Sequence, residues 1–361
     1  MRRLLSMMML ILSLSAVAQD SLSTEQPEGA KKLSWLRRTI RGFSYIDENY
    51  VEPQHYNWSL MVQGSYNYDY YRLSSNNQTI SFAPPPTFKF GPYFGWRWVF
   101  LGYTVDLKNI SFRKSKLELD FSVYAAQLGA DVYYRRTGSG YKIRNVKLGD
   151  GIDTHQLEDI PFSGLKVEVT GLNVYYIFNH KRFSYPAAFA QSTMQKISCG
   201  SWMAGLGYMR NALDFDYHEL ETVVQKHTQQ EVQLDSGLMF KNIDYYNINA
   251  SVGYAYNWVF ARNFLFCASL SASLAYKASR GETTDRGRSR FSISNFNLDG
   301  IGRFALVYNN NRWYAGTSAI VRSYNYHTSR FEANNILGSF DFYVGYNFGA
   351  RGAYKKMKNE R

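Results

Sequence analysis

Apolar and polar side chains alternate along the chain from residue 57 onward, in segments of about ten to sixteen residues separated by turn-forming residues. In the first segment Trp58, Leu60 and Val62 share one face, whereas Ser59 and Gln63 share the other. The same division recurs further along, in the segments around residues 99–108, 116–123, 246–257, 264–277 and 339–348. A strand places successive side chains on opposite faces, so each segment predicts a β-strand with one apolar and one polar face. Many strands of this length and pattern are typical of an antiparallel barrel that spans a membrane.

The connections between these segments alternate between short and long. Short turns are expected near residues 95–97, 126–129, 179–182, 259–263 and 309–311, and longer loops at about 72–85, 110–115, 138–163, 214–242, 279–290 and 328–335. We therefore predict an all-β fold, a transmembrane antiparallel up-and-down β-barrel of about 12 strands, with 10 or 14 as alternatives. This count requires residues 184–212 to form one long, bent strand, with Pro186 near its start and a bulge or kink at Gly200.

The two ends of the chain differ from the barrel segment. Arg2 and Arg3 precede an apolar stretch over residues 4–14 and the small residues before Gln19, which is the pattern of a secretory signal peptide. We expect a signal peptide at 1–18, a periplasmic leader at 19–56, the barrel at 57–349 and a basic C-terminal tail at 350–361. After the signal no apolar run is long enough to cross a bilayer as a helix, so strands must cross it. The expected location is the cell outer membrane.

Composition and charge agree with an exported membrane barrel. The chain has 30 Tyr and 24 Phe but only 8 Pro, a mixture unlike that of helical membrane proteins. Without Arg2 and Arg3 the basic residues exceed the acidic ones by about ten, which favours anionic partners. Because the basic residues are scattered and the protein is expected to be exported, we expect lipid and lipopolysaccharide of the outer membrane as partners, and no nucleic acid.

The two cysteines, Cys199 and Cys267, are too few for a disulfide-stapled scaffold. They fall on segments that are not expected to be neighbours. A disulfide needs Cα atoms within about 7 Å, whereas one intervening strand separates them by roughly 9 to 10 Å. We therefore expect two free thiols.

Several motifs together resemble an uncharacterised "domain of unknown function" family of predicted outer-membrane β-barrels of Gram-negative bacteria. They are Asp47, Asn49, Tyr50, Val51, Pro53, Tyr56 and Asn57, then Tyr133-Tyr134-Arg135-Arg136, then the block from Val174 to Gly205 with its run from Tyr175 to Pro186 and with Gln195, Lys196, Ser198, Gly200 and Ser201. The resemblance covers about residues 45–349. It implies an outer-membrane location and a barrel architecture, but no activity, substrate or catalytic residue. The terminal aromatic that the barrel-assembly machinery recognises in such proteins is followed here by the basic tail, so we expect an internal signal ending at Phe348.

Charged residues fall on the polar faces of the predicted strands and are expected to face the lumen. They are Asp69, Lys89, Asp106, Glu118, Asp120, Asp131, Arg135, Arg303, Arg322 and Asp341, together with Lys116. A lumen of about twelve strands is small, so opposite charges would either close it or line a narrow polar pore. We expect a closed or narrow lumen.

Candidate chemistry is weak elsewhere. The six histidines form no ligand spacing with cysteine or with each other, so we expect no metal, no cofactor and no catalytic residue. His180 with Ser184, or His327 with Ser329, would be the starting point for a lipid hydrolase, which needs Ser, His and an orienting group together. The sequence thus favours a narrow pore, binding or structural barrel that is not an enzyme. A barrel-embedded lipid-modifying hydrolase and a soluble exported β-rich binding protein remain the alternatives.

The last strand provides the clearest facing prediction. Val344 is expected to face lipid, where an arginine would be costly, and Gly345 to face the lumen, where a serine is expected to be mild.

Overall fold

The computed structural model describes residues 46–96, 99–102, 105–106, 117–138, 140–149, 153–280, 296–327, 332–352 and 354. The predicted signal peptide, most of the leader and nearly all of the tail lie outside these ranges. So do Lys116 and Ser329.

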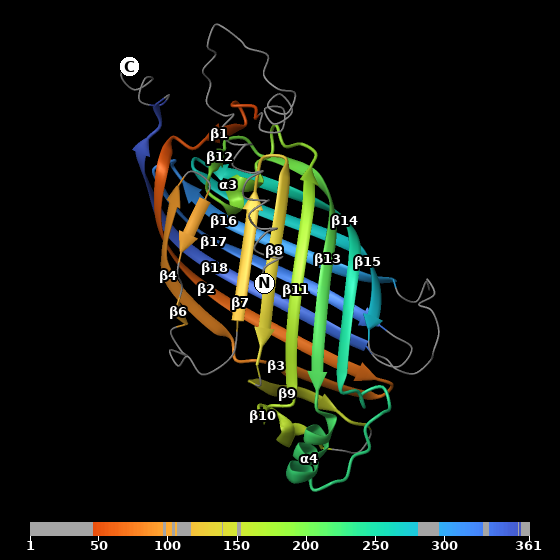
Figure 1. Ribbon diagram of the computed structural model, residues 1–361. Coiled ribbons are helices and arrows are strands. Elements are labelled where there is room, and N and C mark those ends of the chain that lie inside the picture. Colours follow the sequence, from red (N-terminus) through yellow and green to blue (C-terminus); the bar gives the residue numbers. More distant parts are fainter. Residues whose placement is uncertain are drawn as a thin grey trace.

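The fold is an antiparallel sheet curled into a barrel (Figure 1). Its wall strands are β2 (Tyr56–Ser75), β4 (Thr87–Trp96), β5 (Val99–Gly102), β6 (Val105–Asp106), β7 (Leu117–Tyr124), β8 (Leu128–Thr137), β11 (Leu165–Ile177), β13 (Cys199–Phe215), β14 (Asn242–Ala261), β15 (Phe264–Arg280), β16 (Phe296–Asn309), β17 (Trp313–His327) and β18 (Glu332–Ala350). Within the described ranges these make twelve wall strands when β5 and β6, which both pair with β4, are taken as one. The predicted fold class is thus confirmed.

The first and last wall strands pair with each other. β18 runs antiparallel to β2 from Glu332 opposite Ser74 to Ala350 opposite Tyr56. Among the wall strands, the two edges are β5–β6 and β7, which are consecutive in the chain. In Figure 1 the yellow and green strands β7 to β13 cross in front of the blue and orange strands β16 to β18 and β2.

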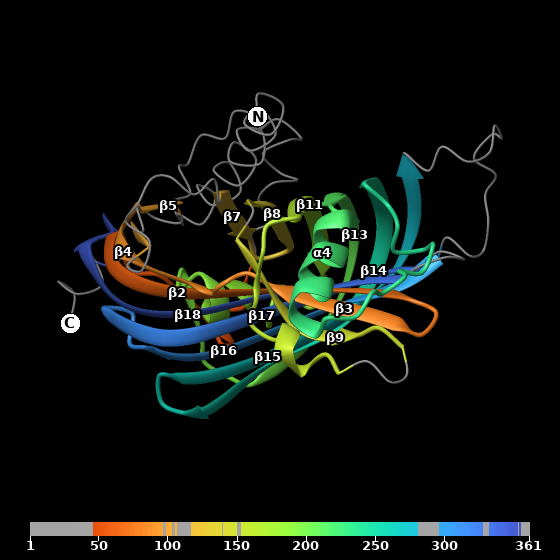
Figure 2. The same ribbon diagram turned by 90° about the horizontal axis from the view of Figure 1, so that it is seen from below.

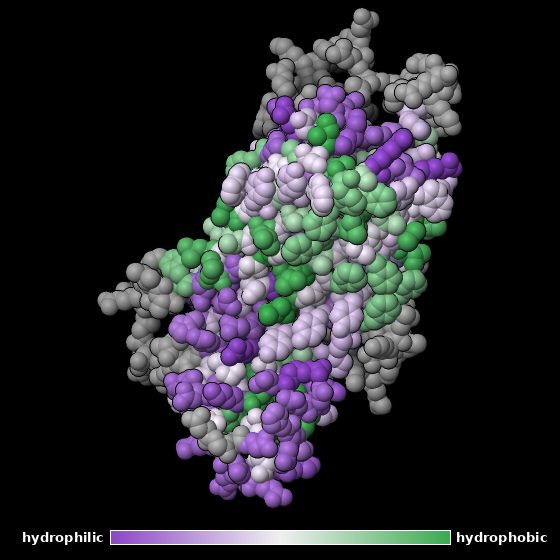
Figure 3. Space-filling view, turned by 180° about the vertical axis from the view of Figure 1, so that it is seen from behind, coloured by the Kyte–Doolittle hydropathy of each residue, from purple (hydrophilic) through white to green (hydrophobic). Residues whose placement is uncertain are grey.

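The wall has an apolar outer surface, as the alternation predicts. Along β13, Trp202 is 61% exposed and Leu206 is 68% exposed, whereas Met203 and Met209 between and beyond them are buried. Leu270 on β15 is 63% exposed. Figure 3 shows hydrophobic side chains gathered across the middle of the outer face, with hydrophilic ones nearer its ends. Among the described helices, none has both the length and the apolar character that a membrane span requires.

Prolines divert one strand from the wall at the end that carries the long connections. After the hairpin at Asn76, β3 (Gln78–Ala83) pairs with the last residues of β2, and Pro84–Pro86 separate it from β4, which pairs with the earlier residues of the same strand. Proline lacks the N–H that a ladder needs, so pairing stops at this point. β3 instead pairs with β9 (Tyr141–Lys147), which continues the sheet to β10 (Pro161–Phe162).

These segments form what we call the loop-end cap, consisting of β3, β9, β10, the 3-10 helix η2 (His155–Leu157) and α4 (Tyr217–Thr228). Helix α4 begins at Asp216, whose carboxylate accepts from the Glu219 N–H, and ends with Gln229 in the left-handed conformation. Figure 2 shows α4, β3 and β9 lying across the mouth of the barrel. The sequence interpretation of 138–163 and 214–242 as plain loops was wrong, because both ranges contain these elements.

The opposite end is filled by what we call the turn-end plug, consisting of β1 (Val51–Pro53), α3 (Tyr185–Phe189) and β12 (Thr193–Gln195). β1 pairs with β12, and Ala187 and Ala188 of α3 pack against Cys267 and Ala305 of the wall. The prediction of one strand over 184–212 was therefore wrong. Ser184 caps a short helix that has Pro186 in its first turn, an arrangement that favours helix initiation, and the wall strand begins only at Cys199.

The two cysteines are free, as predicted. Cys199 on β13 and Cys267 on β15 both lie opposite Asn257 of the intervening strand β14.

Candidate functional site

Charged side chains form a layer inside the barrel between the loop-end cap and the turn-end plug. They lie here because the inner face of each strand receives every second residue, and most of them are almost fully buried. Buried charges are tolerated when they are paired and hydrogen-bonded. The partners of each charge therefore define the site.

Arg135 on β8 connects three strands. Its guanidinium lies 2.5 Å from the Asp69 carboxylate of β2 and 3.3 Å from the Asp120 carboxylate of β7. The Arg135 and Asp69 side chains are only 2% and 1% exposed, whereas that of Asp120 is 39% exposed. Arg135 thus links β7 and β8 to β2, which lies on the other side of the barrel interior (Figure 1).

Lys89 and Glu118 make a second connection. The Lys89 ammonium on β4 lies 2.7 Å from the Glu118 carboxylate on β7, which also accepts a 2.9 Å hydrogen bond from the Asn67 amide. Asp106 is opposite Lys89 in the β4–β6 register. The Lys89–Glu118 pair thus links β4, next to one edge of the wall, to β7 at the other edge.

Arg303 on β16 pairs with Asp131 on β8, and the guanidinium lies over the Tyr175 ring with 5.2 Å to its centroid. Asp131 also accepts a 2.7 Å hydrogen bond from the Ser122 hydroxyl. Both charged side chains are 2% exposed, so this pair is shielded from bulk water.

A further buried pair, Lys277 with Asp299, was missed by the sequence interpretation. The Lys277 ammonium on β15 lies 2.9 Å from the Asp299 carboxylate on β16, and the same carboxylate accepts from the Asn325 N–H at 2.9 Å. Lys277 follows Ser269, Ser271 and Ser273 on one strand face, and this periodicity was the available signal. After Asp299, Gly300 and Gly302 interrupt the alternation of apolar and polar side chains, so the facing of Asp299 was harder to predict.

Arg322 and Asp341 complete the layer. Asp341 on β18 accepts a 3.1 Å hydrogen bond from the Gln63 amide of β2. Arg322 on β17 is 4% exposed and its guanidinium lies over the Tyr133 ring at 5.0 Å from the centroid. Thus the structure joins Asp69, Asp120 and Arg135 in one group, Lys89 with Glu118 in another and Asp131 with Arg303 in a third, while Arg322 and Asp341 belong to none of them.

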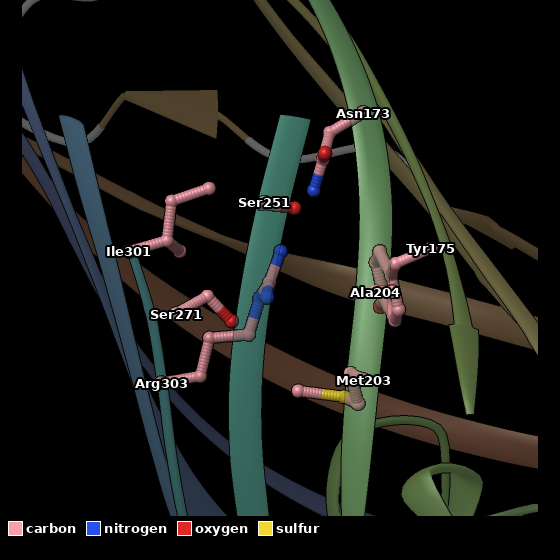
Figure 4. A pocket seen from close by; sticks show the side chains of 8 residues that line it. All are labelled: Asn173, Tyr175, Met203, Ala204, Ser251, Ser271, Ile301 and Arg303. Carbon is pink, nitrogen blue, oxygen red and sulfur yellow. The ribbon is translucent and has the colours of Figure 1, made fainter. Parts of the chain in front are cut away.

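A small cavity lies beside Arg303 (Figure 4). It is lined by Asn173, Tyr175, Met203, Ala204, Ser251, Ser271, Ile301 and Arg303. Its volume is about 10 Å³, roughly the space that one water molecule needs. Figure 4 shows the Asn173, Ser251 and Ser271 side chains and the Arg303 guanidinium converging on this space.

Of the residues considered for a lipid hydrolase, Ser184 and His180 are buried and His327 contacts a carboxylate. The Ser184 hydroxyl is buried in the turn-end plug, where it contacts the Thr193 hydroxyl at 2.7 Å and caps α3. His180 is buried in the turn after β11, and burial lowers the pKa of its imidazole. His327 faces Glu332 across a 2.8 Å contact. Across the described ranges, no three His, Cys, Asp or Glu side chains are grouped so as to hold a metal ion.

Comparison with known proteins gives a family and distant structural neighbours. A family model described as "Domain of unknown function (DUF4421)" matches residues 45–348. No curated protein matches.

Three solved structures illustrate the structural neighbours. The Escherichia coli outer membrane protease OmpT is 8% identical with a TM-score of 0.34, covering 82% of this chain and 98% of its own. The Pseudomonas aeruginosa outer membrane protein OprG is 10% identical with a TM-score of 0.22, covering 82% and 99%. The P. putida toluene transporter TodX is 7% identical with a TM-score of 0.23, covering 82% and 91%. No residue role is transferred from these proteins.

Proposed function

This chain belongs to the family described as "Domain of unknown function (DUF4421)", and we propose that it is a Gram-negative outer-membrane β-barrel with a closed or narrow lumen and a binding or structural role. The observation that carries the proposal is the distribution of side chains across the wall. Apolar side chains are exposed on the outside, and charged ones are buried inside. That is the reverse of a water-soluble β-sandwich, whose apolar faces are buried between its sheets, and it is the arrangement that lipid requires.

Aromatic residues on the outer face support this orientation in a membrane. Trp96, Trp258 and Trp313 are each exposed on strands next to the short turns, and Trp58 is exposed opposite Trp96. Tryptophan side chains concentrate at membrane interfaces. We infer that the turn end lies at one interface of the bilayer and that the apolar band of Figure 3 lies within it.

Both ends of the barrel contain packed structure, which supports a closed or narrow lumen. The loop-end cap shares one buried apolar core with the wall, which includes Tyr71, Leu213, Tyr245 and Leu337 of the wall and Leu220 of α4. At the other end, the Tyr185 hydroxyl of the plug donates to Ser269 of the wall at 2.8 Å. For the barrel to form an open diffusion pore, both the loop-end cap and the turn-end plug would have to move out of the lumen.

The finer parts of the proposal follow from the sequence. We propose export by a cleaved signal peptide, recognition by the barrel-assembly machinery through a signal ending at Phe348, and lipid and lipopolysaccharide as the surrounding partners. We assign no catalytic role, since Ser184 and His180 are held within the turn-end plug region.

Heat modifiability tests the membrane barrel. A closed barrel migrates faster on a gel before boiling than after it, so the detergent-extracted chain should show two mobilities. A single mobility and recovery in the soluble periplasmic fraction would contradict the proposal. Planar bilayer recordings should show small or no steady conductance, and a large one would contradict the closed lumen.

Orientation is tested with single cysteines in a chain whose Cys199 and Cys267 are replaced by alanine. Asn145→Cys on β9 and Gln225→Cys on α4 place exposed thiols on the loop-end cap, and Asn310→Cys places one in a short turn. Because an even number of strands returns the chain to the periplasm, a membrane-impermeant maleimide should label the first two on intact cells and spare the third. Equal labelling of Asn310→Cys would reverse the orientation.

A further inference from the structure

We propose that the turn end of the barrel binds the phosphate of an anionic phospholipid headgroup at Arg312; the inference rests on the proposed membrane insertion and names one class among the surrounding lipids. Arg312 lies in the short turn between β16 and β17, where its side chain is exposed. Its Nε and Nη2 atoms donate to the Tyr346 hydroxyl of β18 at 3.0 and 2.7 Å. Its guanidinium carbon lies 5.4 Å from the centroid of the Tyr346 ring. Tyr346 therefore holds this cation against the outer face of the wall.

The charge of Arg312 has no carboxylate partner among the described residues. The phenol that it contacts is uncharged at physiological pH, and only two of the five N–H donors of a guanidinium are engaged there. Glu52, the acidic residue that contacts the same turn, instead lies 3.2 Å from His55 and accepts from the Asn311 amide at 3.3 Å. Arg312 can therefore form further hydrogen bonds with an anion from outside the chain.

Hydroxyl and guanidinium groups of neighbouring residues lie beside this turn. Tyr56 and Tyr354 are both close enough to Arg312 to interact with it electrostatically. The Tyr354 ring lies 6.0 Å from the Tyr56 ring and stacks on His55 at 4.3 Å between centroids. Arg351 is held here by its Nε, which donates to the Tyr56 carbonyl at 3.2 Å. Arginine forks and phenol hydroxyls are donors that match the oxygens of a phosphate.

The position of Arg312 in the proposed membrane corresponds to the headgroup level. Trp313, the next residue, is 52% exposed, and its ring lies 4.6 Å from the Tyr346 ring. Aromatic contacts on the outer face continue from Tyr346 to Phe348 and Phe94. Tryptophan and tyrosine side chains mark the interface between headgroups and acyl chains. A phospholipid whose phosphate contacts Arg312 would thus place its acyl chains along the apolar band of Figure 3.

The charge of this end favours an anionic headgroup over a zwitterionic one. Among the described residues of the turn end, the basic ones are Lys181, Arg182, Lys196, Arg262, Arg312 and Arg351, and the acidic ones are Asp47, Glu48 and Glu52. From Tyr354 the sequence continues through residues 355–361, which include four basic residues and one acidic residue. A zwitterionic headgroup carries its own cation next to the phosphate, whereas phosphatidylglycerol keeps a net negative charge. We therefore expect phosphatidylglycerol to be favoured, since each arginine near an anionic lipid surface adds to the attraction.

The test measures how strongly brominated lipids quench the fluorescence of Trp313 in the full-length chain, refolded into phosphatidylcholine vesicles. Brominated phosphatidylglycerol or brominated phosphatidylcholine replaces the same minor fraction of the lipid. The Trp313 contribution is the difference between the chain and its Trp313→Phe variant. Because one arginine at an anionic surface contributes a roughly fivefold preference, phosphatidylglycerol should quench Trp313 at about a fifth of the mole fraction that phosphatidylcholine needs. Equal quenching by the two lipids would overturn the proposal.

Arg312→Gln is the test variant, and Arg262→Gln is its matched control, because Arg262 is an exposed arginine of another short turn, between β14 and β15. Both variants lose one positive charge from the same end of the barrel. Arg312→Gln should lose most of the preference for phosphatidylglycerol, whereas Arg262→Gln should keep it. An equal loss in both variants would reduce the effect to the overall charge of the surface and overturn the assignment to Arg312.

Tyr346→Phe keeps the aromatic ring but removes the hydroxyl that holds the guanidinium, so it should lower the preference roughly twofold. A preference that this variant leaves unchanged would overturn the positioning role of the hydroxyl. Heat modifiability confirms that each variant is folded. Since heat modifiability and surface labelling do not depend on the lipid headgroup, their persistence with equal quenching by the two lipids would overturn this inference alone.

Discussion

The loop-end cap and the charged layer occupy neighbouring parts of one barrel interior, yet they are held together by different forces. The cap is an apolar core in which Phe82 stacks on Phe162 and meets Phe215 edge-on. The charged layer is a set of ion pairs that connect strands far apart in sequence, as Arg135 does with Asp69. An apolar core loses stability in proportion to the volume removed. A buried ion pair loses most when one partner is removed, because the other charge remains.

The largest expected effect comes from breaking a pair in the charged layer. Arg303→Met leaves Asp131 buried without its cation and should lower the free energy of unfolding by about 3 to 5 kcal/mol. Urea unfolding of the refolded barrel measures this. Adding Asp131→Asn to the variant should restore much of the loss.

The matched control for that experiment is Arg210→Met, because the Arg210–Asp244 pair is exposed. An exposed pair contributes about 0 to 1 kcal/mol. Equal losses in the two arginine variants would mean that the interior is as well solvated as the outer surface.

The cap should respond to loss of volume. Leu220→Ala removes a fully buried side chain of α4 and should cost about 2 to 5 kcal/mol, as for other buried leucines. Leu270→Ala on the exposed face of β15 is the control and should cost far less in detergent. If Leu220→Ala also raises the conductance of the barrel, then the cap is what closes that end. A negligible cost would show that α4 is not packed into the mouth.

The two faces of β18 provide the smallest contrast. Val344→Arg places a charge on the lipid side and should cost about 2 to 4 kcal/mol near the midplane. The sequence predicts that Gly345→Ser is mild, but the structure leads us to expect a cost, because a Cβ at Gly345 would lie 2.1 Å from the Tyr314 ring. Overpacking of this kind costs about 1 to 3 kcal/mol. Insertion into lipid vesicles and urea unfolding of both variants test these two expectations. A serine variant as stable as the natural chain would show that the Tyr314 side chain moves freely.

Sequence periodicity was sufficient for the wall and for the facing of its strands. Long alternating segments such as 246–257 leave little ambiguity, because a shift of one residue would turn every apolar side chain inward. The same reasoning kept Cys199 and Cys267 apart. It placed Asp131 and Arg303 on inner faces, although it could not pair them, since their strands are adjacent neither in sequence nor in the wall.

The interior fillings were missed by this reasoning. The strand over 141–147 and the helix over 217–228 contain neither Gly nor Pro, and Asp216 followed by Glu219 is a helix-start signal, but the expectation of long connections between wall strands outweighed these local patterns. Ser184 and Pro186 did give a helix signal, but the requirement for strict strand alternation outweighed it. Tertiary packing inside the barrel decided both cases, as it also did for the crowding of Gly345 by Tyr314.

The pairing of β2 with β18 determines how this barrel can fold. Among the strand pairs of the described residues, β2 and β18 have the highest sequence separation, and forming their contacts carries the greatest loop-closure entropy. They cannot form until β18 has been synthesised and delivered to the membrane. Because β3 continues from β2 into the cap, the strand that waits longest for its partner also anchors the structure across the mouth. Closure of the wall should therefore be the slow, late step of assembly, and until it occurs the β2 edge remains free to pair with another strand.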